Sequence, residues 1–183
     1  MLFYSYRCPV SGEPMRRNLL QVLRKILAES DETIDLTYRI SLVQINTDYE
    51  IPYLAGYSLD GHIIYIDKRL PRWFITKSGR KIDVYKYLIV HEVWEKYLED
   101  TKNYKYPYAH EKATGKERQA VEKDKIEWDE YQGYMLKMVK KLEKFTGPLP
   151  VTLDTKPEKD THDRYRYQKI QKIKEKELRE GYQ

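Results

Sequence analysis

Apolar residues recur every three or four positions in four segments of the chain, a period typical of α-helices. These segments cover residues 14–31, 82–98, 107–123 and 128–145. The second segment is apolar on nearly every side, which predicts a helix buried inside the protein. Residues 164–180 carry many charges and few apolar anchors, so we expect either an exposed or partner-docked helix or a mobile segment.

A different pattern predicts strands in the first half of the chain. Residues 33–45 alternate between apolar and polar side chains, the period of a half-buried strand. Apolar residues 51–57 and 62–67 flank Asp60-Gly61, a dipeptide typical of tight hairpin turns. The chain is therefore expected to form a hairpin before its buried helix.

These elements predict an α+β fold. It combines a small antiparallel or mixed sheet with an N-terminal helix and a buried helix that two further helices follow. A chain of 183 residues with 40% hydrophobic residues can build one domain with a substantial core. We place this domain at residues 1–150 and expect residues 151–183 to be a charged C-terminal linker that can end in a helix.

The cysteine content limits the kinds of site that the chain can build. Cys8 is the single cysteine, which excludes an internal disulfide framework and a cysteine-rich zinc module made by one chain. A metal ion would have to be held by histidine and carboxylate side chains. The sequence contains no run of about 20 apolar residues and no apolar signal-peptide core, so we expect a cytoplasmic protein without membrane contact.

Chemistry concentrates in the predicted buried helix, at His91-Glu92-x-x-Glu95. Positions four apart lie on one helical face, so His91 and Glu95 can reach the same ion. Glu92 is turned about 100 degrees to the side, where a carboxylate can take a proton from a metal-bound water. Zinc accepts such a mixed ligand set, and its catalytic sites keep three protein ligands and one open position.

The third ligand should come from an element that packs back onto this helix. His110 stands near the start of the next predicted helix, after a connector long enough to reverse the chain direction. Glu111, Glu117 and Glu122 compete with it for this role.

The order of elements over residues 14–145 resembles the minimal core of zincin metallopeptidases. The residues that match are His91 and Glu92 in the buried helix; the chain departs from the family at Glu95, where a second histidine is expected. This departure bears on zinc affinity and metal preference, and another divalent ion is an alternative. The hairpin and the His-Glu helix are also similar to short uncharacterised phage-encoded proteins, which implies no function.

The zincin resemblance implies a zinc-dependent hydrolase acting on a peptide or protein substrate. His91, Glu95 and His110 would bind Zn²⁺, and Glu92 would be the general base. Strand 63–67 would be the edge to which an extended peptide adds. Stabilisation of the oxyanion would fall to His62 or to a tyrosine of the connector, with candidates Tyr104, Tyr106 and Tyr108.

Two other classes of protein remain open. Residues 68–81 form a predicted basic loop that could contact nucleic acid, in a non-catalytic binding protein, through Arg69, Arg72, Lys77 and Arg80. The net charge of +5 does not decide this, because lysine and glutamate alternate along the chain. Alternatively, the His-Glu helix is only part of the core of a structural or assembly protein, and the charged C-terminal segment docks a partner.

Overall fold

The computed structural model describes Arg39 and residues 42–181 of the chain. The chain divides into Met1–Ser41 and Leu42–Gln183, and the fold below is that of the second unit. The predicted helix 14–31 lies outside the described residues. The predicted strand 33–45 is described mainly at its end, where Leu42 is helical and strand β1 covers only Gln44–Asn46.

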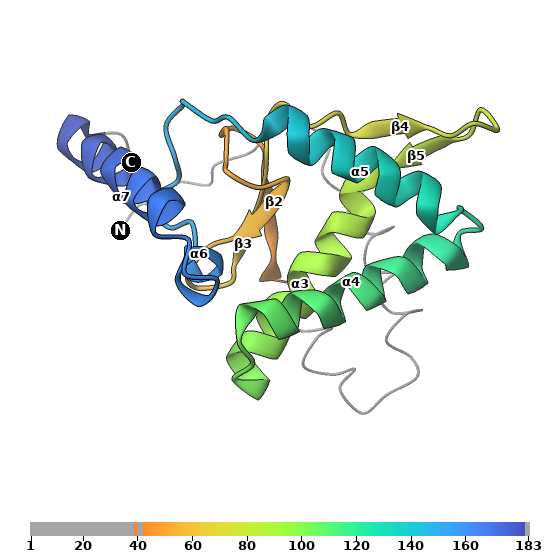
Figure 1. Cartoon of the computed structure of the whole chain (residues 1–183), viewed down its shortest axis with the longest axis horizontal. Helices are drawn as coiled ribbons and strands as arrows, with labels where there is room; N and C mark the ends of the chain where they lie inside the picture. The colour runs from red at the N-terminus through yellow and green to blue at the C-terminus, as the bar shows by residue number, and fades with distance from the viewer. Residues whose placement is uncertain (1–38, 40–41, 182–183) are drawn as a thin grey trace, which may run out of the picture. The chain divides into compact units, whose positions relative to one another are not determined.

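The second unit is an α+β structure, whose described residues form five helices and two small sheets (Figure 1). In the first sheet, strand β3 (Ile63–Ile66) pairs in parallel with β1 and antiparallel with β2 (Ala55–Tyr57). The Asp60-Gly61 hairpin is confirmed, and Gly61 adopts a φ of 71° that favours glycine. The expectation that strand 63–67 is an edge is wrong, because β3 is central and β2 lies at the edge.

The predicted basic loop is instead a second hairpin. Strands β4 (Trp73–Ile75) and β5 (Lys81–Asp83) pair antiparallel, and Gly79 between them has a φ of 83°. The aromatic and branched residues of β4 favour this extended structure, and the ring of Phe74 stacks on Tyr134 with centroids 4.5 Å apart. Ile82, the expected start of the buried helix, therefore belongs to β5.

Three helices follow: α3 (Val84–Lys102), α4 (Tyr106–Lys123) and α5 (Trp128–Leu142). Helix α3 is buried on most of its length, as its sequence predicts. It ends at Asn103, whose left-handed conformation turns the chain, and Pro107 in the first turn of α4 suits a helix start. None of the helices in the described part of the chain is long and apolar enough to cross a membrane.

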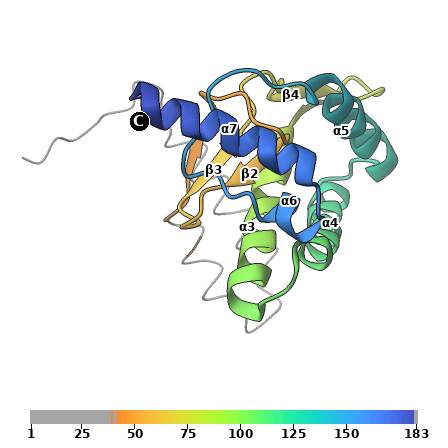
Figure 2. The same ribbon diagram turned by 60° about the vertical axis from the view of Figure 1, so that its left-hand side comes forward.

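The C-terminal residues pack against the same core as the sheet. The segment expected to be a linker contains helix α6 (Lys156–Asp160), and the charged segment forms helix α7 (Arg164–Glu180). Helix α7 runs across the three-stranded sheet (Figure 2), with Ile170 in the core cluster beside Tyr65 of β3. The neighbouring strand positions point to the other face, on which α3 packs.

Candidate metal centre

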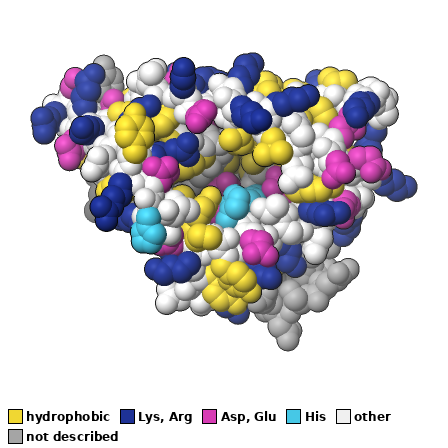
Figure 3. Space-filling model, viewed as in Figure 1, with side chains coloured by type: hydrophobic (Ala, Val, Ile, Leu, Met, Phe, Trp, Pro, Cys, Tyr) yellow, Lys and Arg dark blue, Asp and Glu magenta, His cyan; other side chains and the backbone are white. Residues whose placement is uncertain are grey.

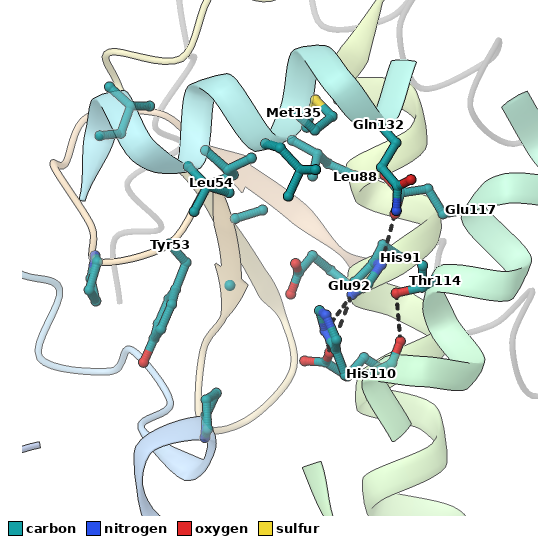
Figure 4. Close-up of a pocket in the computed structure, with 18 of the residues that line it drawn as sticks. Tyr53, Leu54, Leu88, His91, Glu92, His110, Thr114, Glu117, Gln132 and Met135 are labelled. Atoms are coloured by element: carbon teal, nitrogen blue, oxygen red, sulfur yellow. Dashed lines mark hydrogen bonds and ion pairs between the residues drawn. The ribbon is translucent and has the colours of Figure 1, made fainter. Parts of the chain in front are cut away.

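Helix α3 supplies a row of buried ionisable groups. His91, Glu92 and Glu95 are exposed to only 6%, 6% and 4%, so each needs a partner that replaces water. The spacing of four residues brings His91 Nε2 to 3.3 Å from Glu95 Oε2. His91, Glu92 and Glu95 all line a cavity beside α3. Figure 4 shows His91 and Glu92 at its wall.

The turn between α3 and α4 brings His110 to this pair. His110 Nδ1 lies 2.8 Å from Glu95 Oε2 and 3.0 Å from His91 Nε2. Glu117 lies about two helical turns after His110 on α4. It contacts His91, which precedes Glu95 on α3. A later residue of α4 thus contacts an earlier residue of α3, which requires the two helices to run antiparallel. The short connection at Asn103 therefore brings His110 and Glu117 to α3.

The three ligand atoms of His91, Glu95 and His110 suit a small divalent cation. They all lie within 4.8 Å of one another, and their pairwise separations are 2.8, 3.0 and 3.3 Å. Metal–ligand bonds of about 2.0–2.1 Å in a tetrahedron place neighbouring ligands ~3.3 Å apart, so the cluster needs only a small expansion to hold zinc. His110 is exposed and lines the cavity, so water can reach the cluster from that side.

Glu117 is not a member of this ligand cluster but holds its first histidine. Its Oε2 lies 3.0 Å from His91 Nδ1, and its Oε1 accepts a hydrogen bond of 2.6 Å from the Tyr131 hydroxyl of α5. A carboxylate on Nδ1 favours the tautomer that leaves Nε2 free to bind a metal. Of the other candidates for third ligand, Glu111 is exposed and Glu122 pairs with Arg118 on the surface.

Charge in this cluster is finely balanced by burial and contacts. Burial alone would lower the pKa of His91, but its hydrogen bonds with Glu117 and Glu95 raise that pKa well above 6.5. Burial would raise the pKa of Glu95, but the contacts from His110 and His91 lower it below 4.5. The carboxylates therefore attract positive charge to this point, which a proton on His91 or a cation can supply.

Glu92 stands in a different environment. Burial, with a further contribution from the Glu95 carboxylate, raises the pKa of Glu92 well above 4.5. Its side chain lines the cavity beside His91 (Figure 4), and no hydrogen bond to another described residue holds it. A carboxyl group with a raised pKa at the wall of a cavity is suited to accept a proton.

The cavity has a volume of about 460 Å³, within the range of ligand-binding sites. Figure 3 shows it as a hollow on one face, with histidine and acidic side chains inside and hydrophobic side chains around it. Its walls are α3, α4, α5, strand β2 and the segment around α6. The site is therefore open to a molecule larger than water.

The structure separates the tyrosines that the sequence left equivalent. Tyr106 lines the cavity, and its hydroxyl lies 3.4 Å from His110 Nδ1, while Tyr104 and Tyr108 contact each other away from the cavity lining. Burial, followed by the charge of Glu95, raises the pKa of Tyr106, so this phenol stays protonated and can donate a hydrogen bond. His62 is exposed beside Asp60 in the hairpin and does not line the cavity.

Three of the four basic residues considered for nucleic-acid contact have structural partners. Arg69 pairs with Asp67 and donates to carbonyl groups at the end of α5, and Arg72 pairs with Asp83. Arg80 donates to the carbonyls of Asp124 and Lys125 after α4, and Lys77 is exposed. The Arg72 pair lies at the base of the β4–β5 hairpin, and the Arg80 contacts hold the hairpin against the end of α4. The nucleic-acid contact remains a prediction.

Comparisons with protein-family models, with curated proteins and with solved structures gave no match to this chain.

Sequence reasoning missed the roles of Glu117 as partner of His91 and of Tyr131 as partner of Glu117. One signal was present, since Glu117 lies seven residues after His110 and so on the same stripe of α4. Tyr131 carries no comparable signal, because its contact depends on how α5 packs across α4.

Proposed function

We propose that this protein is a metal-dependent hydrolase of the zincin-like type that cleaves peptide bonds, with Zn²⁺ held by His91, Glu95 and His110. The observation that carries the proposal is the convergence of these three side chains at the wall of a cavity that Glu92 also lines. The buried helix with its His-Glu pair, followed by a helix that returns with the third ligand, supports the resemblance to the zincin core. Another divalent ion is compatible with the same ligands.

A bound Zn²⁺ would lower the pKa of its water towards neutrality and polarise the carbonyl of the scissile bond. Glu92 takes the proton from the attacking water and passes it to the leaving amine as the C–N bond breaks. Tyr106 donates its phenolic hydrogen bond to the oxygen on which negative charge develops. Glu117 keeps His91 oriented throughout by its contact with Nδ1 of that histidine.

Strand β2 is suited to hold the main chain of the substrate. The Tyr57 carbonyl on its outer side accepts a hydrogen bond of 2.9 Å from the Asp154 amide, so this edge already pairs with another segment at one end. Ala55, two residues earlier, directs its peptide groups to the same side and lines the cavity. An extended peptide can therefore add to β2 beside the metal ligands.

The test measures metal content and turnover in the same preparations. Elemental analysis after dialysis against zinc should give about one ion per chain in the native protein, and His110→Ala, at a partly exposed position, should lose it without unfolding. Glu92→Gln should keep the metal and reduce cleavage of a quenched fluorescent peptide library by a factor of about 10² or more.

His62→Ala is the matched control, because His62 is an exposed histidine outside the cluster; metal and turnover should both be unchanged. A native protein that takes up no ion, or a Glu92→Gln variant that cleaves peptides at the native rate, would contradict the proposal.

A further inference from the structure

One wall of the cavity is apolar and belongs mainly to α5. Met135, Leu136, Val139 and Leu142 line it from that helix, and Leu54 faces them from the segment before β2. Figure 4 shows Met135 on α5 above Leu54, with His91 and Glu92 to one side. The apolar wall, defined by these five residues, is thus continuous with the candidate metal centre.

Two of these side chains are unusually exposed for their type. Leu136 is 55% and Val139 50% exposed, whereas Met135 and Leu142 on the same wall are buried. Exposed apolar surface is costly in water, and a contiguous patch of it beside a cleft is typical of binding sites. These five side chains offer no strong hydrogen-bond partner to a polar group, which would lose its water against them without compensation, whereas Gln132 and Lys140 of α5 line other parts of the cavity.

We propose that the apolar wall is the side-chain subsite of the substrate, so that the protein selects peptides with a large apolar residue of the leucine, methionine or phenylalanine class beside the scissile bond. This inference rests on the proposed function. Strand β2 and α5 are opposite walls of one cavity. A peptide paired with β2 directs alternate side chains out of the strand plane, and this wall receives the one next to the metal ligands.

Kinetics with paired peptides test the specificity. Peptides that carry phenylalanine or serine at the position beside the cleaved bond are compared in the native protein and in a Leu136→Ser/Val139→Ser variant. The native protein should prefer phenylalanine, and the variant should lose about tenfold or more of kcat/KM for that peptide while its rate on the serine peptide changes little. Both positions are exposed, so the variant should fold.

Leu178→Ser is the matched control, since Leu178 is 58% exposed on α7 and does not line the cavity. It should leave the preference unchanged. Equal cleavage of both peptides by the native protein, or a preference that survives in the double variant, would overturn the inference while the hydrolase proposal stands.

A binding measurement separates the two proposals further. N-acetyl-phenylalaninamide is titrated into the zinc-treated protein, and the methyl resonances of Met135, Leu136 and Val139 are followed by NMR, with N-acetyl-serinamide as the comparison. Selective shifts with the phenylalanine probe support the subsite even where no peptide is cleaved, which would refute only the hydrolase. Shifts with neither probe, or equal shifts with both, would refute the subsite.

Discussion

His91 has a separate partner on each ring nitrogen, and this arrangement defines the site at the scale of single residues. Glu117 contacts Nδ1, while Glu95 and His110 surround Nε2. Tyr131 in turn fixes Glu117, so a continuous hydrogen-bonded chain runs from α5 through α4 to α3. Because each buried polar group depends on the next, the orientation of His91 is set by residues outside the candidate ligand set.

The variant Glu117→Gln tests this role as a positioning residue. The amide keeps the shape of the side chain but removes the charge that favours a proton on Nδ1, so zinc affinity should fall about 10–100-fold. Competition with a chromophoric chelator measures it. Glu122→Gln, at an exposed position of the same helix, should have no effect. Native affinity in Glu117→Gln would show that Glu117 serves packing alone.

At the scale of elements, the decisive unit is the antiparallel pair of α3 and α4. Its near end is closed by the turn at Asn103, and its far end is tied by Asp124 directly after α4. Asp124 Oδ2 accepts hydrogen bonds from Lys86 and Tyr87 in the first turn of α3. Both ends are therefore fixed, which holds His110 and Glu117 in register with His91 and Glu95.

The contacts of Asp124 should make the stability of the native protein depend on acid pH. Burial opposes the charge of Asp124, but the hydrogen bonds from Lys86 and Tyr87 outweigh it and lower its pKa below 3.8. The ionised Asp124 carboxylate therefore stabilises the fold above about pH 3.8. This stabilisation is lost as the carboxylate becomes protonated below that pH. Since Asp124 is partly exposed, Asp124→Asn should cost only about 1 kcal/mol at pH 7.

Urea unfolding of both proteins between pH 7 and pH 3 measures the difference, which should shrink at the acid end. Glu111→Gln, an exposed acid on the same helix, is the control and should show no such trend. A difference between Asp124→Asn and the native protein that is constant with pH would assign the effect to packing.

The whole molecule brings the candidate site together from segments far apart in sequence. The ligands come from α3 and α4, and the cavity around them is completed by β2, α5 and the segment around α6. Helix α6 is part of this arrangement, because its Glu158 accepts a hydrogen bond from Tyr53, which lines the cavity. Helix α7 contributes Arg166 to the same lining. An ion bound between α3 and α4 would therefore stabilise the folded unit as a whole.

Zinc should raise the thermal midpoint of unfolding. A ligand that binds only the folded state at 100 times its dissociation constant adds about 2.7 kcal/mol, which corresponds to roughly 5–10 °C for a domain of this size. Calorimetry with and without zinc, after treatment with a chelator, measures the shift. The shift should vanish in His110→Ala and persist in His62→Ala. A thermal midpoint of the native protein that does not change with zinc would argue against a bound ion.

The sequence predicted well those elements whose pattern is local and strong. Helices α3, α4 and α5 and the turn at Asp60-Gly61 follow from periodicity and turn chemistry that neighbouring residues share. The β4–β5 hairpin was missed because each of its strands has only three residues. An alternation of apolar and polar side chains over so few residues is not distinguishable from a loop rich in basic residues. The packing of α7 was left open because, of its three buried residues, Lys174 and Glu177 are charged and Ile170 is apolar.

By itself, the sequence determined that His91 and Glu95 share one face of a buried helix, because that follows from 3.6 residues per turn. Only the tertiary structure decided that His110 rather than Glu111 or Glu122 meets them, since the choice depends on how two helices pack. It also placed Glu117 on the other nitrogen of His91. Periodicity fixes which side chains share a face, whereas contacts between elements depend on packing that no local pattern records.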